Sequence, residues 1–150
     1  MQAKVITYGT FDLFHIGHLR LLERLKDLGN YLIVAVSSDD FNQLKGKTAT
    51  FPFEARARIV RALKCVDEVI PETCWEQKID DIRQYKVDVF GIGNDWQGKF
   101  DFLNEFCRVV YLERTEGISS SEVKDAIRLS PNIQRPTLDE RALEAFRNEK

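Results

Sequence analysis

The amino-acid sequence predicts an α/β protein with a doubly wound parallel sheet. Apolar, β-branched runs of strand length alternate with amphipathic segments of helix length as far as residue 129. The run YLIVAVS at 31–37 is continuously apolar, which is typical of a strand buried on both faces of a parallel sheet. Such sheets bind ligands beyond the carboxyl ends of their strands. We therefore expect one Rossmann-like domain over residues 1–129, with its site at that edge.

The first helix is predicted at 17–29. Leu21, Leu25 and Leu28 repeat along one of its faces, and Gly29 stands where a C-cap is expected. Strand, helix and strand follow one another here within about thirty residues, which is a βαβ unit with a right-handed crossover. The unit comprises a strand at 3–8, this helix and the strand at 31–37.

The alternation continues with a helix predicted at 52–64, where Pro52 suits a first-turn position because it lacks an amide hydrogen. The last helix of the domain begins with serines, which can accept hydrogen bonds from its free amides. Beyond it, TLDE at 137–140 is a capping-box signature, so we expect residues 130–150 to form a linker and a helical extension. The intervening elements are a strand at 66–70, a helix at 75–85, strands at 87–93 and 107–112, and a helix at 119–129.

Composition excludes several classes of protein. The chain has 150 residues and a formal net charge of −2, whereas a dedicated nucleic-acid-binding protein normally has a basic excess. No apolar stretch reaches membrane-spanning length, and the first residues lack the apolar run of a signal peptide. Cys65, Cys74 and Cys107 form no C-x-x-C pair, so we expect free thiols, a cytoplasmic protein and no metal held by the chain itself.

Both histidines of the chain lie in YGTFDLFHIGH at 8–18, between the first strand and the first helix. A helix N-terminus offers unpaired backbone amides to an anion, and Gly9 and Gly17 allow the backbone to approach a ligand closely. His15 and His18 can each donate a hydrogen bond to a phosphate oxygen. The alternative is that His18 caps or packs locally and His15 is solvated. Two histidines bracketing a glycine at this position favour the phosphate site.

A second segment, RTEGISSS at 114–121, follows the last predicted strand and opens the last helix, again a position for an anion. Neither segment has the spacing of a dinucleotide fingerprint or a P-loop. HIGH instead matches the H-x-G-H signature of nucleotidyltransferases, and RTEGISSS matches the R-T-x-G-I-S-[ST]-[ST] signature of cytidylyltransferases. The sequence thus resembles the cytidylyltransferase family. The stretches at 75–78, 95–103 and 109–119 resemble its glycerol-3-phosphate branch.

The resemblance implies an enzyme that makes CDP-glycerol and pyrophosphate from CTP, bound with Mg²⁺, and glycerol 3-phosphate, for a cell-surface polymer such as teichoic acid or a capsule. It also implies a homodimer. The implied catalytic residues are His15, His18, Lys45 and Arg114. The implied nucleotide-binding residues are Thr10, Phe11, His15, Ile16, Gly17, His18, Lys47, Gly93, Asp95, Arg114, Thr115, Glu116, Gly117, Ile118, Ser119, Ser120 and Ser121.

The acceptor side is implied by scattered polar residues. Lys45 and Lys47 lie in LKGKT, which we predict to be a flexible loop after the second strand, and alone they would be ordinary surface charges. By the resemblance, Lys45 meets the acceptor phosphate and Lys47 meets CTP. Lys78 and Asp12 are implied as further substrate-binding residues, the latter positioning ligand or metal.

Other residues near these segments have two interpretations. The G-x-G of FGIGNDW, Gly91 and Gly93, fits either a turn close to the nucleotide or a simple tight turn. Trp75 and Trp96 fit either the core or the wall of the acceptor pocket. Departures from residues frequent in the family occur at Ala55, Lys64 and Asn94, and they could alter acceptor preference.

The chemistry agrees with the resemblance. A phosphate monoester has a second pKa of about 6, so the attacking oxygen is already ionised at neutral pH and needs no general base. Cations and hydrogen-bond donors are needed to bring two anions together. Three alternatives stay open: another acceptor, such as a different polyol phosphate or an amino-alcohol phosphate; ATP in place of CTP, against which RTEGISSS argues; and a non-catalytic nucleotide-binding module.

Overall fold

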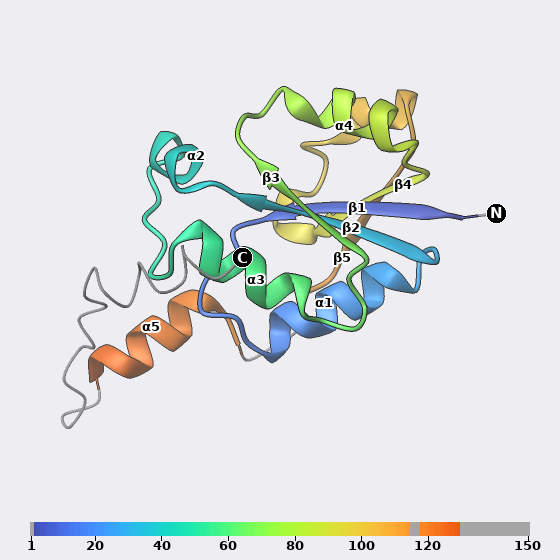
Figure 1. The fold of residues 1–150 in the computed structure, drawn as a ribbon. Coiled ribbons are helices and arrows are strands. Elements are labelled where there is room, and N and C mark those ends of the chain that lie inside the picture. Colours follow the sequence, from blue (N-terminus) through green and yellow to red (C-terminus); the bar gives the residue numbers. More distant parts are fainter. Residues whose placement is uncertain (1, 115–117, 130–150) are drawn as a thin grey trace.

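The computed structural model describes residues 2–114 and 118–129, which form a sheet between two layers of helices (Figure 1). In chain order the elements are β1 (Lys4–Gly9), α1 (Ile16–Lys26), β2 (Tyr31–Ser37), α2 (Asp39–Leu44), α3 (Phe53–Arg61), β3 (Glu68–Glu72), α4 (Gln77–Tyr85), β4 (Val89–Gly93), the 3₁₀ turns η1 (Asn94–Trp96) and η2 (Asp101–Glu105), β5 (Arg108–Leu112) and α5 (Ser120–Leu129). The predicted linker and helix at 130–150 lie outside the described residues.

The five strands of the described residues are all parallel and lie in the order β3-β2-β1-β4-β5. The chain starts at the centre of the sheet, proceeds through β2 to one edge at β3, and then returns to β4 and the other edge at β5. The turning point of this path lies between β1 and β4, where neighbouring loops diverge and leave room for a ligand. The predicted doubly wound fold is confirmed.

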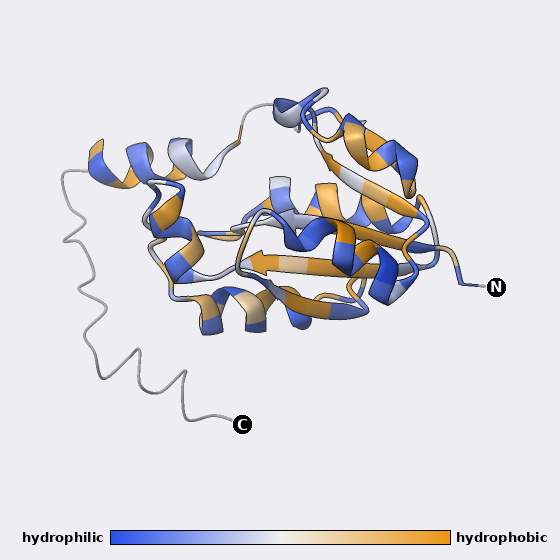
Figure 2. Cartoon of the chain, turned by 90° about the horizontal axis from the view of Figure 1, so that it is seen from above, coloured by the Kyte–Doolittle hydropathy of each residue, from blue (hydrophilic) through white to orange (hydrophobic). Residues whose placement is uncertain are grey.

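Strand β2 has apolar side chains on both faces of the sheet, and helices cover both faces. Leu32, Val34 and Val36 join the apolar cluster beneath α1 and α3, whereas Ile33 and Ala35 join the cluster beneath α4 and η2. All five side chains are fully buried, as the continuously apolar run predicts. In Figure 2, hydrophobic colour runs along the strands and appears as stripes on the helices. The sheet is therefore a rigid base for the loops at its carboxyl edge.

Helix α2 was not predicted. The Ser38 hydroxyl caps it by accepting a hydrogen bond from the Phe41 amide at 3.1 Å. Its six residues include only Phe41 and Leu44 as large apolar side chains, too few to show helical periodicity. Lys45 is the C-cap, and Gly46 follows with φ of +72°. The first part of the segment expected as a flexible loop is thus the ordered end of a helix.

Two predicted helix ends differ from the structure. Pro52 lies outside the helix as the N-cap of α3 rather than in its first turn. Helix α1 ends earlier than predicted, with Asp27 as its C-cap. Gly29 is instead needed for packing, because a Cβ there would lie 2.3 Å from the carbonyl oxygen of Ala3.

Of the two glycines of FGIGNDW, Gly91 is not in a turn, whereas Gly93 precedes the turn η1 and lines the cavity. Gly91 lies inside β4, where a Cβ would lie 2.3 Å from a methyl carbon of Leu25, so its absence lets α1 pack closely on the sheet. Gly93 ends the strand, and space is open where a Cβ would stand.

Strand β3 is shifted two residues from its predicted bounds and contains Pro71, which an edge strand tolerates. Among the described residues, no helix has the length and apolar character to cross a membrane.

Candidate active site

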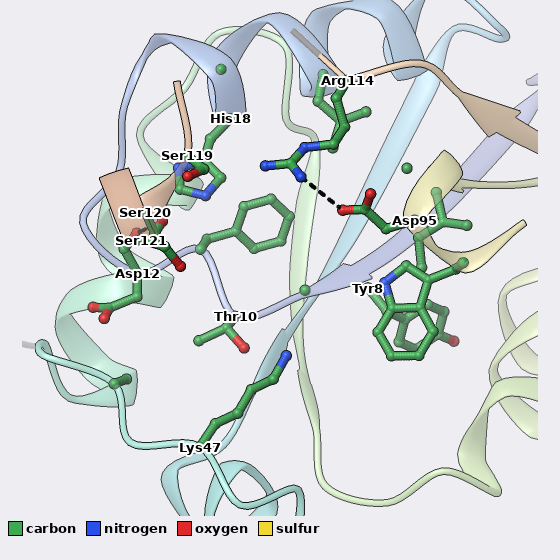
Figure 3. Close-up of a pocket in the computed structure, with 18 of the residues that line it drawn as sticks. Tyr8, Thr10, Asp12, His18, Lys47, Asp95, Arg114, Ser119, Ser120 and Ser121 are labelled. Carbon is green, nitrogen blue, oxygen red and sulfur yellow. Dashed lines mark hydrogen bonds and ion pairs between the residues drawn. The ribbon is translucent and has the colours of Figure 1, made fainter. Parts of the chain in front are cut away.

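A cavity of about 720 Å³ opens at the carboxyl ends of the strands. In Figure 3, His18 and three serines stand at one end, Tyr8 and Asp95 at the other, and Lys47 and Arg114 point in from opposite walls. Ile16 is not among its lining residues and is 48% exposed, while Thr115, Glu116 and Gly117 lie outside the described residues. The predicted site residues that line it are Thr10, Phe11, Asp12, His15, Gly17, His18, Lys45, Lys47, Lys78, Gly93, Asp95, Arg114, Ile118, Ser119, Ser120 and Ser121.

The two histidines build the start of α1 together. His15 is the N-cap, and its Nδ1 accepts a hydrogen bond from the Gly17 amide at 3.0 Å. The His18 Nδ1 accepts in return from the His15 amide at 3.2 Å. The two rings stack with their centroids 3.9 Å apart. The alternatives of capping and phosphate binding are therefore compatible, because each ring caps the helix through one nitrogen and lines the cavity.

This arrangement fixes the protonation state of both rings. A nitrogen that accepts a hydrogen bond carries no hydrogen, so each neutral imidazole has its proton on Nε2. Burial, followed by the neighbouring His15, lowers the pKa of His18 to about 4, and burial also lowers the pKa of His15. The Nε2 atom of His15 is buried and has no hydrogen-bond partner among the described residues. Two neutral rings, each with its hydrogen on Nε2, thus line the cavity at neutral pH.

We predict that His18 titrates with a midpoint near pH 4 in the ligand-free protein. Protonation would place a hydrogen on Nδ1 and break its bond to the His15 amide. The unfolded chain takes up this proton at about pH 6.5 and the folded chain does not, so the contribution to stability falls as pH drops from 6.5 towards 4. Long-range ¹⁵N–¹H NMR across this range reports both tautomer and midpoint. Titration of both rings near 6.5 would contradict the proposed tautomers.

Helix α5 brings its first turn to the same end of the cavity. The Ser119 hydroxyl caps it by accepting from the Glu122 amide at 3.1 Å, as the sequence predicts. The Ser120 hydroxyl donates to the main-chain oxygen of Asp12 at 2.8 Å and ties the helix to the first loop. Lys124, one turn further on, also lines the cavity. The N-termini of α1 and α5 therefore offer amides, hydroxyls and a cation to one anion.

Asp12 has its acceptors occupied by the protein. Its carboxylate accepts from the amides of Thr50 and Phe51 at 2.7 and 3.0 Å, and Lys124 Nζ lies 3.5 Å away. The side chain is buried, and its contacts join the first loop to the segment that precedes α3. These contacts favour a structural role for Asp12 over the substrate or metal contact implied by the resemblance.

Arg114 and Asp95 face each other across the mouth of the cavity, with 3.6 Å between Nη1 and Oδ2 (Figure 3). Both side chains are more than half exposed, so solvent screens this pair and it contributes little to stability. Arg24 on α1 donates to the main-chain oxygen of Glu113 at 2.8 Å and so fixes the residue before Arg114. The guanidinium can exchange Asp95 for a phosphate while its backbone stays in place.

Lys45 and Lys78 are joined by a chain of hydrogen bonds through Ser37 and Glu72. Lys45 Nζ donates to the Ser37 hydroxyl at 3.0 Å, and that hydroxyl donates to Glu72 Oε1 at 2.7 Å. Lys78 Nζ donates to the other carboxylate oxygen at 2.9 Å in an ion pair that is almost completely buried. Burial lowers the pKa of Lys45, an effect that Glu72 opposes. The hydrogen bonds through Ser37 to Glu72 therefore hold the Lys45 ammonium at the cavity wall.

The comparisons with known proteins bear on this geometry. The family model described as cytidylyltransferase-like matches residues 6–126, which include both histidines and the first two turns of α5. The chain belongs to the cytidylyltransferase-like family. The predicted fold and class of enzyme, a nucleotidyltransferase, are confirmed with it.

Individual members of the cytidylyltransferase-like family are similar over most of this chain. The glycerol-3-phosphate cytidylyltransferase of Bacillus spizizenii (strain ATCC 23059 / NRRL B-14472 / W23) is 58% identical over 123 residues, which are 82% of this chain and 95% of the relative. That of Staphylococcus aureus (strain NCTC 8325 / PS 47) is 51% identical over 126 residues, or 84% and 96%. The solved lipopolysaccharide core biosynthesis protein of Thermoplasma volcanium GSS1 has a TM-score of 0.66 at 25% identity, covering 77% of this chain and 100% of its own.

The sequence interpretation missed several residues that line or support this cytidylyltransferase-like site, among them Lys124, Tyr8, Glu72 and Arg56. Lys124 could have been found by its position one turn after the capping serines. Tyr8 is the last residue but one of β1 and Glu72 is the last residue of β3, so both lie at the carboxyl edge of the sheet, where ligands bind. Arg56 gave no signal, because an arginine on an amphipathic helix is usually solvated, yet it is 1% exposed here. Trp75 and Trp96, left open between core and pocket, both line the cavity.

The described residues contain no group of three or more His, Cys, Asp or Glu side chains that could hold a metal ion. Two carboxylates at this site have protein partners: Asp12 holds backbone amides and Asp95 faces Arg114. These side chains fit a Mg²⁺ ion that arrives on a triphosphate and keeps most of its water molecules. They fit less well a Mg²⁺ ion that is coordinated by the protein alone.

The three cysteines are free and partly buried.

Proposed function

We propose that this protein transfers the cytidylyl group of CTP to glycerol 3-phosphate, forming CDP-glycerol and pyrophosphate. The observation that carries this proposal is one continuous cavity that joins two histidine donors and the α5 N-terminus to Lys45 and Lys78. A phosphate-binding end beside a second cationic end is what a reaction between two phosphates requires. The identity to glycerol-3-phosphate cytidylyltransferases supports the choice of nucleotide and acceptor.

The triphosphate lies in this proposal between the starts of α1 and α5. The Nε2–H groups of His15 and His18 donate to phosphoryl oxygens on which negative charge grows during transfer. Arg114, Lys47 and Lys124 supply positive charge around the departing pyrophosphate. The backbone at Thr10 and Phe11, together with Gly93, Asp95 and residues 118–121, surrounds the rest of the nucleotide. These roles follow from the resemblance and agree with the positions of the described residues along the cavity wall.

Lys45 holds the acceptor phosphate and guides it to the α-phosphorus. A bond forms between one ionised acceptor oxygen and the α-phosphorus, while the bond from that phosphorus to the bridging oxygen breaks and releases pyrophosphate. No proton has to be removed from the acceptor, because its second pKa of about 6 leaves it ionised at neutral pH. Mg²⁺ enters with CTP as part of the substrate and neutralises phosphate charge. The histidines therefore act as donors and not as bases.

We further propose that the protein works as a homodimer in the cytoplasm and supplies CDP-glycerol for a cell-surface polymer such as teichoic acid or a capsule. The dimer and the polymer come from the family resemblance. Three free cysteines support a reducing compartment. Light scattering at micromolar concentration tests the dimer independently of activity.

The test of the proposed function is pyrophosphate release with CTP or ATP, Mg²⁺ and a panel of acceptors. The panel contains glycerol 3-phosphate, a longer polyol phosphate, choline phosphate and ethanolamine phosphate, and mass spectrometry identifies the product. We expect turnover with CTP and glycerol 3-phosphate and a product with the mass of CDP-glycerol. Absence of pyrophosphate with every pair would refute the enzyme. Turnover of CTP with a different acceptor alone would keep the class and replace the substrate.

A further inference from the structure

We propose that the Lys78 ammonium occupies a cation-binding box in the acceptor end of the cavity, and that its presence makes the site select polyol phosphates and reject amino-alcohol phosphates. This inference rests on the proposed function, because it names the feature that distinguishes between the acceptors of one reaction. Lys78 thereby becomes a specificity-determining residue, whereas the resemblance implies only that it contacts the acceptor.

The box is built from three aromatic rings and one carboxylate. Lys78 Nζ lies 4.6 Å from the ring centroid of Tyr8, 4.9 Å from that of Trp75 and 5.4 Å from that of Phe100. Glu72 accepts its hydrogen bond at 2.9 Å. The Lys78 side chain is only 3% exposed, although all five residues line the cavity. The ammonium is therefore enclosed on several sides by groups that favour a cation.

These groups are the ones that proteins use to hold a substituted ammonium ligand. Aromatic faces attract a cation through their quadrupoles, most strongly where water is excluded, and a carboxylate adds charge. An amino-alcohol phosphate, held by its phosphate, would bring its own cation towards the same box. It would meet Lys78 there in a site of low dielectric, where like charges repel strongly. A hydroxyl group instead can accept a hydrogen bond from the ammonium or donate one to Glu72.

The box is adjacent to the proposed phosphate position. Lys45 Nζ lies 5.8 Å from the centroid of the same Trp75 ring and is joined to the same Glu72 through Ser37. A small acceptor whose phosphate contacts Lys45 therefore has its other end near Lys78. Trp75 is 45% exposed, so this part of the cavity is open to an entering substrate.

The test compares kcat/KM for glycerol 3-phosphate and choline phosphate in the wild-type protein and in Lys78→Ala. We expect the wild type to prefer glycerol 3-phosphate, and the ratio of the two values to fall by about 30-fold or more in the variant, since an added cation then has the box to itself. The KM for CTP should stay within about twofold in this comparison. Methylammonium added to Lys78→Ala should restore part of the activity with glycerol 3-phosphate. An unchanged ratio in a folded variant would overturn the inference.

The matched control is Lys99→Ala. Lys99 also stands over an aromatic ring, 5.4 Å from the centroid of Trp96, but it is exposed and does not line the cavity. Its substitution should leave the acceptor ratio unchanged.

A second measurement on the wild type removes any dependence on the folding of Lys78→Ala. Tetramethylammonium chloride should inhibit turnover of glycerol 3-phosphate no more than sodium chloride at equal ionic strength, because the box is filled. Specific inhibition by tetramethylammonium would show an open box and overturn the inference. Failure of the proposed function looks different, since the wild type would then release no pyrophosphate from CTP and glycerol 3-phosphate.

Discussion

Replacing either histidine by alanine is expected to lower kcat by about 10²–10³-fold, the usual effect of removing one donor that is aimed at a developing negative charge. His15 and His18 both line the cavity, and their rings are held by hydrogen bonds between Nδ1 and backbone amides, which leaves Nε2–H as the donor of each ring. Steady-state pyrophosphate release with CTP and glycerol 3-phosphate measures the change. Near-wild-type rates in both alanine variants would defeat the assignment.

The dual use of His15 calls for a variant that separates its two roles. Asparagine is a good N-cap residue, so His15→Asn should keep the start of α1 while it removes the ring donor. We expect this variant to unfold close to the wild type in urea and to lose activity as alanine does. Arg20→Ala, on the exposed face of the same helix, serves as the control and should change neither quantity.

Replacing Arg56 by methionine is expected to lower the free energy of unfolding by about 3–5 kcal/mol, because it leaves several buried carbonyl groups without a partner. The guanidinium is 1% exposed and fixes the ends of two strands and the segment before α3. It donates to the main-chain oxygens of Thr10, Ser37 and Phe51 at 2.8 to 2.9 Å and to Asp39 Oδ1 at 2.8 Å.

Urea unfolding followed by circular dichroism measures the effect. Arg61→Met is the control on the same helix, since Arg61 is exposed, and it should stay within about 0.5 kcal/mol of the wild type. A loss of less than about 1 kcal/mol for Arg56→Met would mean that water replaces the guanidinium at these carbonyls. The variant also moves the Thr10 backbone, so we expect the KM for CTP to rise with the loss of stability.

The strands and most helices could be predicted because the pattern of apolar residues within each short segment indicates which side chains are buried. A run such as 31–37 has apolar side chains at every position, and only a sheet covered on both faces hides them all. Helix α2 escaped because six residues are too few to show a period. The start of α5 was predictable because its serines are the capping residues themselves.

The sequence predicted many of the residues that line the cavity, but not the contacts that hold their side chains. The loops after β1 and β5 carry recognisable motifs, and most of their described residues line the cavity. The partners of charged residues depend on contacts between distant parts of the chain, which no local pattern encodes. The backbone amides on Asp12 and the bond from Arg24 to Glu113 are examples, separated by 38 and 89 positions.

Helix α5 carries part of the proposed phosphate-binding end of the cavity, yet none of its residues is buried. Its attachments to the first loop are the hydroxyl bond from Ser120 and the ion pair from Lys124, both to Asp12. A segment with so little packing has a low free energy of local opening, and a ligand that binds only the closed form raises it by mass action. Slower amide hydrogen exchange in this helix should therefore be a direct readout of nucleotide occupancy.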